Sequence, residues 1–215
     1  MAPLVDNSTV VENLSEIYKK RFQNSTSCEE LLANYTFDPL VLIDVDWKTF
    51  YFWNAAKEPL HMFRFSVPYP VLVDRFRTEL NLTPPVDWNR TALFMETSND
   101  FSALFISTNT SGRFRIVTNL DFYHDLPYTE MAIKLVKPFY VILLQCEFRF
   151  GYALAPFDDM PDEKHIDDAI SVLGIKSEFN ETYLYEEQFY SQFSMLDDHK
   201  NEDEYEDEEY LDDEL

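Results

Sequence analysis

Residues able to do acid–base, nucleophilic or metal chemistry are present, but they form no recognisable catalytic pattern. The histidines show no metal-ligand spacing: His61, His124, His165 and His199. His165 and Asp168 are three residues apart in an expected helix, which predicts only a surface pair. No glycine flanks a serine as in a hydrolase nucleophile elbow, and the three glycines cannot form a phosphate-binding loop. We therefore expect no enzyme, no catalytic residue, no metal site and no required cofactor.

Aromatic side chains are more informative, because they lie in or beside segments typical of strands. In a closed β-barrel such rings either line a lumen that holds one small apolar ligand or fill the lumen completely. The sequence leaves both outcomes open. The candidate ligand-binding residues are Trp53, Phe63, Phe65, Phe94, Phe105, Phe114 and Tyr140. Arg64, Arg77 and Arg115 are candidate partners for a ligand carboxylate, although alternation leaves their face undetermined.

Asparagine and cysteine usage indicates the compartment. Eight of the 12 asparagines lie in N-x-[ST] sequons, which predicts a secreted, extracellular glycoprotein. Cys28 and Cys146 are the only cysteines, and in an oxidising compartment they most simply form a disulfide with each other. Two buried free thiols are the alternative. The expected glycosylation sites are Asn7, Asn13, Asn24, Asn34, Asn81, Asn89, Asn109 and Asn180.

The net charge of −23 argues against nucleic acid as a partner, because phosphate would be repelled. Residues 197–215 carry 12 acidic side chains and one lysine, a composition that predicts a disordered tail. The tail is a solubilising segment or a docking segment for a basic protein surface, with Tyr205 and Tyr210 as candidate sulfation sites. Its end, DDEL at 212–215, is similar to an endoplasmic-reticulum retention signal.

The strand pattern predicts an all-β fold. Strand-like segments fall at residues 41–55, 62–67, 71–80, 91–97, 102–107, 113–122, 131–136, 139–148 and 150–155. A helix is expected from Pro161 to Leu173, with Gly174 as its stop, followed by an extended stretch at 182–188. The order favours an antiparallel barrel or sandwich. No apolar run is long enough for a transmembrane helix, so we expect no membrane insertion. The first residues lack signal-peptide features, so we expect a mature chain.

Three segments resemble the lipocalin family, in its branch of bilin-binding proteins, insecticyanins and apolipoprotein D. They are WNAAKEP at 53–59, YVILLQC at 140–146, and DDAISVLGI at 167–175 followed by TYLY at 182–185. The resemblance implies an eight-stranded up-and-down barrel with a C-terminal helix, and a disulfide between Cys28 and Cys146. The family's G-x-W falls on FYF at 50–52, so we expect Phe52 and neighbouring aromatics to close the barrel base.

The predicted organisation is a polar, glycosylated arm at 1–27, a lipocalin-like barrel at 28–195 and an acidic disordered tail at 196–215. The predicted function is non-catalytic carriage of a small hydrophobic ligand such as a bilin, fatty acid or retinoid. The alternative is a protein-binding module with a filled barrel, whose acidic tail engages a basic partner such as a protease exosite. An enzyme of the endoplasmic-reticulum lumen is a third, weaker hypothesis.

Overall fold

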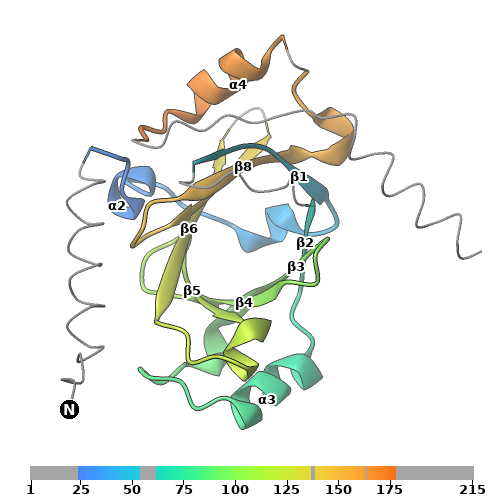
Figure 1. Ribbon diagram of the computed structural model, residues 1–215, viewed down its shortest axis with the longest axis vertical. Coiled ribbons are helices and arrows are strands. Elements are labelled where there is room, and N and C mark those ends of the chain that lie inside the picture. Colours follow the sequence, from blue (N-terminus) through green and yellow to red (C-terminus); the bar gives the residue numbers. More distant parts are fainter. Residues whose placement is uncertain (1–23, 54–61, 137–138, 163, 178–215) are drawn as a thin grey trace, which may run out of the picture. The chain divides into compact units, whose positions relative to one another are not determined.

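The computed structural model describes residues 24–53, 62–136, 139–162 and 164–177. Its centre is a closed barrel of eight antiparallel strands, each paired with the next and the last paired with the first (Figure 1). The predicted all-β, up-and-down barrel is therefore confirmed. The strands are β1 (Asp46–Trp53), β2 (Met62–Ser66), β3 (Thr91–Thr97), β4 (Ser102–Ser107), β5 (Arg113–Thr118), β6 (Thr129–Val136), β7 (Tyr140–Gln145) and β8 (Gly151–Pro156).

Strand β1 closes the barrel, because it pairs with β2 through its first residues and with β8 along nearly its whole length. Trp47 lies opposite Phe63 on β2 and opposite Pro156 on β8. The register shifts between Thr49 and Tyr51, which marks an irregularity in the β1–β8 ladder. The start of β1 therefore lies at one end of the barrel, here named the base, and the β3–β4 and β7–β8 turns lie at the other end, here named the mouth.

The segment predicted as a strand at 71–80 is instead the helix α3 (Pro70–Glu79), so that prediction was wrong. The β-branched residues at its start suggested a strand, but Pro70 occupies the first helical turn, where its missing N–H costs nothing. Leu72 and Phe76 share one face of the helix and pack on the outer surface of β3–β5. The pair between Arg75 and Glu79 lies on the exposed side.

The helix expected at the C-terminal side is α4 (Ile166–Leu173), and Gly174 ends it in a left-handed conformation with φ of 64°. The helix begins later than Pro161, because the Asp162 side chain accepts hydrogen bonds from the backbone N–H groups of Lys164 and His165. The His165 ring contacts Asp162 as well, at 2.6 Å, rather than Asp168. Asp162 therefore stabilises a turn at the position where the sequence suggested the first helical turn.

The remaining helical elements are short. They are α2 (Cys28–Leu31) and the 3₁₀ turns η1 (Pro39–Leu42), η2 (Trp88–Arg90), η3 (Asn119–Phe122) and η4 (Phe157–Asp159). Ser27 and Glu30 form a capping box that fixes the start of α2. In the part of the chain that is described, no helix is long and apolar enough to cross a membrane.

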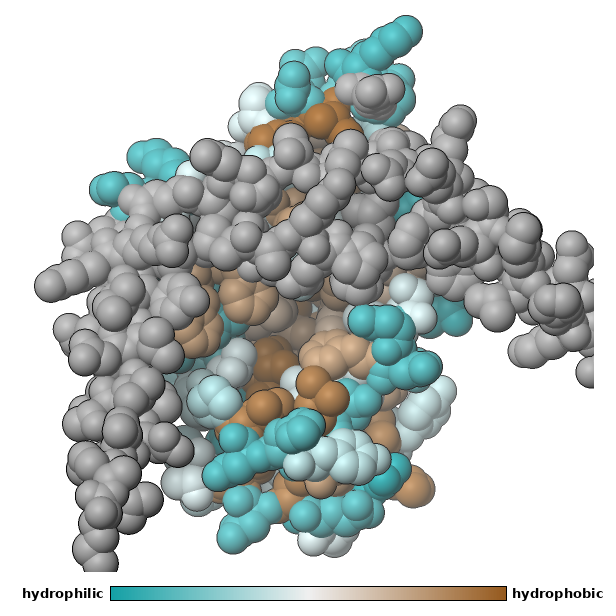
Figure 2. All heavy atoms as spheres, in the orientation of Figure 1, coloured by the Kyte–Doolittle hydropathy of each residue, from teal (hydrophilic) through white to brown (hydrophobic). Residues whose placement is uncertain are grey.

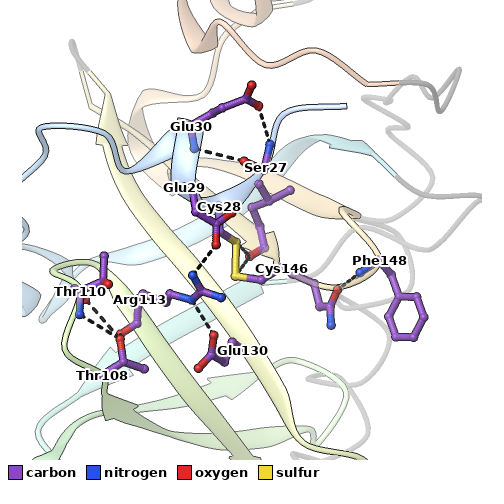
Figure 3. Close-up of a disulfide and its surroundings, with 12 residues drawn as sticks. Ser27, Cys28, Glu29, Glu30, Thr108, Thr110, Arg113, Glu130, Cys146 and Phe148 are labelled. Atoms are coloured by element: carbon purple, nitrogen blue, oxygen red, sulfur yellow. Dashed lines mark hydrogen bonds and ion pairs between the residues drawn. A yellow bond between two sulfur atoms is a disulfide. The ribbon is translucent and has the colours of Figure 1, made fainter. Parts of the chain in front are cut away.

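A disulfide joins Cys28 on α2 to Cys146, the residue that follows β7, with an S–S distance of 2.05 Å. The predicted pairing is therefore confirmed. Beside it, the Arg113 guanidinium lies between Glu29 on α2 and Glu130 on β6 (Figure 3). The disulfide and this pair of ionic contacts together hold α2 on the outer wall of the barrel.

Three hydrophobic clusters account for the packing. One fills the barrel interior, a second lies between the outer wall and α2 and α4, and a third lies between the outer wall and α3. The two outer clusters flank different parts of the wall, which matches the separate places of α3 and α4 in Figure 1. Figure 2 shows the face of the molecule that is turned toward the viewer in Figure 1. Hydrophobic side chains are recessed near the centre of this face, and hydrophilic side chains lie below them.

Candidate ligand-binding cavity

The base half of the barrel interior is filled by aromatic rings. Phe105 packs edge-on against Phe65 and Phe114, with ring centroids 6.0 and 5.8 Å apart. Phe37, from the segment that crosses the base, packs against Phe114 at 5.9 Å. These four side chains are buried and pack against one another, so rings occupy this level of the described interior.

Trp47 closes the base, rather than Phe52 as expected. Its indole Nε1–H donates to the Leu42 carbonyl at 3.0 Å, and both residues belong to the interior cluster. Phe52 is buried, but it pairs with Tyr152 near the start of β8, at the mouth end. The physical reason is strand direction, because β1 enters the barrel at the base and Phe52 belongs to the fifth of the six residue pairs between β1 and β8.

The mouth half encloses a cavity of about 320 Å³. Eight of the described side chains that line it are apolar or aromatic, and they come from β2, β3, β5, β6, β7 and β8 as well as from the turns. Five are polar and uncharged: Thr97, Asn99, Thr118, Thr129 and Gln145. Six of the apolar ones are Phe63, Met95, Phe101, Ile116, Met131 and Leu143. The arrangement can bury one small apolar molecule beside a few polar groups.

The polar side chains of the cavity mostly hydrogen-bond to the protein. Thr97, Thr118 and Thr129 donate their hydroxyl hydrogens to Phe101 O, the Asp121 carboxylate and Pro127 O. Gln145 is 2% exposed, and its Oε1 accepts from the Phe148 backbone N–H in the β7–β8 turn. Asn99 is exposed in the β3–β4 turn, and its side-chain amide contacts the Thr97 hydroxyl. The turns at the mouth therefore position both amides.

The structure separates the seven predicted ligand-binding residues. Phe63 lines the cavity, whereas Phe65, Phe105 and Phe114 belong to the filled base. Trp53 and Tyr140 lie in the outer cluster with α4, and Phe94 lies in the outer cluster under α3.

Strand alternation explains this separation. On β3, Leu93 and Met95 point inward, so Phe94 between them points outward. The cavity residues Met95, Met131, Leu143 and Gln145 were missed. The sequence did hold a signal for two of them: a disulfide to a segment before the barrel places Cys146 outward, and so Gln145 and Leu143 inward.

None of the three candidate arginines lines the cavity. Arg64 pairs with Asp46 and Arg77 with Asp74 on the exposed surface. Arg115 is buried on the outer wall, where its Nη1 donates to the carbonyls of Pro84 and Pro85. Burial lowers the pKa of this guanidinium, which lies over the Tyr128 ring.

Arg115 also borders a second, outer pocket of about 220 Å³ with Asp121, Asp125 and Tyr128. Its described partners are backbone carbonyls of the segment after α3, and its Nε has no hydrogen-bond partner among the described residues. The side chain therefore attaches that segment to the barrel wall.

All five candidate glycosylation sites within the described residues are exposed: Asn24, Asn34, Asn81, Asn89 and Asn109. Asn7, Asn13 and Asn180 lie outside the described residues, as do Tyr205, Tyr210, the acidic tail and the extended stretch at 182–188. Across the described ranges, no three His, Cys, Asp or Glu side chains converge to form a group that could hold a metal ion.

Comparison of the chain with models of known protein families, with curated proteins and with solved structures finds no match. The function is therefore argued from the cavity itself.

Proposed function

We propose that the protein is a lipocalin-like carrier that reversibly binds one small hydrophobic molecule in the mouth half of its barrel, without catalysis. The observation that carries the proposal is the cavity of about 320 Å³, which has an apolar lining and lies inside a closed barrel. Transfer of a ligand with about 200 Å² of apolar surface from water into such a cavity provides a driving force of about 5 kcal/mol.

The size of the cavity favours the smaller members of the predicted ligand classes. Its volume is near the lower end of the range found for small-molecule sites. A retinoid-like ring system or a short acyl chain suits this space better than the four pyrrole rings of a bilin. No arginine lines the described wall, so a fatty acid would find no guanidinium there for its carboxylate.

Secretion and glycosylation are part of the same proposal. Support comes from the disulfide between Cys28 and Cys146 and from the exposure of all five described sequon asparagines. An extracellular carrier needs no reduced thiols, and glycans on exposed turns leave the cavity accessible. Peptide mapping of the secreted protein before and after glycan removal would test this part directly.

Titration of the full chain with N-phenyl-1-naphthylamine tests the proposal. This neutral probe becomes fluorescent in apolar surroundings, and its rings are small enough for the cavity. Saturable binding of one molecule per chain, lost in urea, is the expected result. Native mass spectrometry of protein from its own tissue would then identify a resident ligand. Absence of saturable binding would contradict the proposal.

The second candidate is a protein-binding module. It is favoured by the filled base half and by the 12 carboxylates of residues 197–215. Deletion of 197–215 distinguishes the two functions, since it should leave small-ligand binding intact and abolish binding to a basic partner. If the deletion changes neither property, the tail serves solubility alone.

A further inference from the structure

The Gln145 side chain at the mouth has unused hydrogen-bond donors. Its oxygen already accepts a hydrogen from the Phe148 backbone N–H. This contact fixes which end of the amide is the oxygen, since an NH₂ group cannot accept. The NH₂ group donates to no residue that the structure describes. Its hydrogens therefore remain available to a molecule in the cavity.

Only 2% of Gln145 is exposed, and the residue lines the cavity. A ligand in the cavity can therefore supply the acceptor that this NH₂ group does not find among the described residues. The three threonines that share the lining have already donated their hydroxyl hydrogens to protein oxygens. Among the described polar side chains of the lining, Gln145 is the buried one whose hydrogens are left open.

The described lining of the cavity has no charged side chain. A ligand carboxylate would lose its hydration without meeting a cation among the described lining residues, in a chain with a net charge of −23. A ligand ammonium would meet no lining carboxylate either, because Asp121 contacts Thr118 and borders the outer pocket. Charged ligands of both signs are therefore disfavoured.

We infer that the cavity selects neutral ligands that carry a carbonyl or hydroxyl oxygen at the end facing the mouth, with Gln145 as the main specificity-determining residue. The apolar body of the ligand lies toward Phe63 and Leu143, and its oxygen accepts from the Gln145 NH₂ group. This inference rests on the proposed carrier function and specifies its ligand class.

Four naphthalenes of nearly equal shape test the inference in competition with N-phenyl-1-naphthylamine. They are 2-ethylnaphthalene, 2-acetylnaphthalene, 2-naphthoate and 2-(aminomethyl)naphthalene, which present a hydrocarbon, a ketone, an anion and a cation. The full chain is prepared without glycans in an oxidising bacterial compartment. We expect the ketone to bind tighter than the anion and the cation.

The decisive quantity is the ratio of the dissociation constants of the ethyl and acetyl compounds, in the parent and in Gln145→Met. The cost of dehydrating the ketone is the same for both proteins, so it cancels when the two ratios are compared. We expect the substitution to reduce the preference for the ketone about tenfold. The control, Asn109→Met, removes an amide from the exposed β4–β5 turn and should leave the ratio unchanged.

A second variant, Gln145→Glu, keeps an oxygen that accepts from Phe148 and so preserves the turn. It should weaken ketone binding and strengthen binding of the aminomethyl compound. An unchanged ethyl-to-acetyl ratio in both Gln145 variants, or tightest binding by the naphthoate, would overturn the inference while the carrier function stands. If neither the fluorescent probe nor any naphthalene binds, the carrier function fails and this inference with it.

Discussion

The base half and the mouth half of the barrel interior are enclosed by the same sheet, yet one is solid and the other hollow. Toward the base, inward positions carry the rings of Trp47, Phe65, Phe105 and Phe114. Toward the mouth, the inward positions carry mainly methionine, isoleucine, leucine, threonine and glutamine, which leave about 320 Å³ open. The size of the side chain at each level therefore determines where a barrel can hold a ligand.

The two halves also differ in how they are closed and supported. The base is covered by Leu42 and Trp47, whereas α2 is attached to the outer wall by its disulfide to Cys146, beside the β7–β8 turn, and by Arg113. The mouth is bordered by turns, including those that hold Asn99 and Gln145. We therefore expect the base to contribute stability and the mouth to contribute binding, and four predictions test this division.

The largest expected effect is that of Phe105→Ala in the base. The side chain is fully buried and contacts two other rings, so its loss should lower the free energy of unfolding by about 3–5 kcal/mol. Urea denaturation measures the change. Phe101→Ala at the mouth is the matched control and should cost about 1 kcal/mol, because Phe101 is only partly buried. Equal losses at the two positions would contradict the division.

The next effect is expected from Met131→Trp, which makes the mouth resemble the base. The larger side chain occupies the cavity, so the affinity for N-phenyl-1-naphthylamine should fall at least about tenfold. Stability should change by less than about 1 kcal/mol, because the space was empty. Val172→Trp on the exposed surface of α4 serves as the control and should bind like the parent. Undiminished binding in Met131→Trp would place the ligand elsewhere.

Arg115→Met tests whether the outer pocket belongs to the cavity. The substitution removes the donor to the Pro84 and Pro85 carbonyls, and we expect a loss of about 1–2 kcal/mol in unfolding free energy. Probe affinity should stay the same, since Arg115 lies on the outer wall. Arg64→Met breaks only an exposed ion pair and should cost less than about 0.5 kcal/mol. A weakened probe affinity in Arg115→Met would mean that the two pockets are coupled.

The smallest effect concerns acid and the ionic contact that helps to hold α2 on the outer wall. Hydrogen bonding to its own backbone N–H, and then to Arg113, lowers the pKa of Glu29. A lowered folded-state pKa adds stability above the ordinary value near 4.5, and this stability is lost as the pH falls through the folded-state value.

Because Glu29 is largely exposed, we expect Glu29→Gln to cost less than about 0.5 kcal/mol at pH 7 and nothing at pH 2. Urea midpoints at the two pH values measure the difference, with Glu30→Gln as a comparison on the same helix. A loss that persists at pH 2 would show that the Glu29 carboxylate charge is not its source.

Alternation predicted an antiparallel barrel or sandwich, and the resemblance to lipocalins narrowed this to an eight-stranded barrel. The number of cysteines predicted the disulfide, and Gly174 predicted the end of α4. The sequence pattern misassigned α3, where β-branched residues suit a strand but Pro70 and the packing of Phe76 on the wall decide for a helix. In that segment tertiary contacts overrode local preference.

The cavity was harder to predict than the fold. Alternation gives the side of the sheet for each residue but not its height along the barrel axis, and height separates Phe63 at the cavity from Phe65 in the base. The height of a residue depends on the stagger between neighbouring strands. That stagger is determined by strand pairing across the whole sheet. Phe94 and Phe105 were assigned to one lumen because neither their face nor their height was known.

The pairing of β1 with β8 has a consequence for how the molecule folds. Trp47 and Pro156 lie opposite each other in the ladder although they come from the first and last strands of the barrel. Pairings so distant in sequence form slowly, because a long loop must close before its contacts are made. On the ribosome, the aromatic rings of the base emerge well before the strand that completes their enclosure. We therefore expect the nascent chain to be prone to aggregation until β8 has been translated.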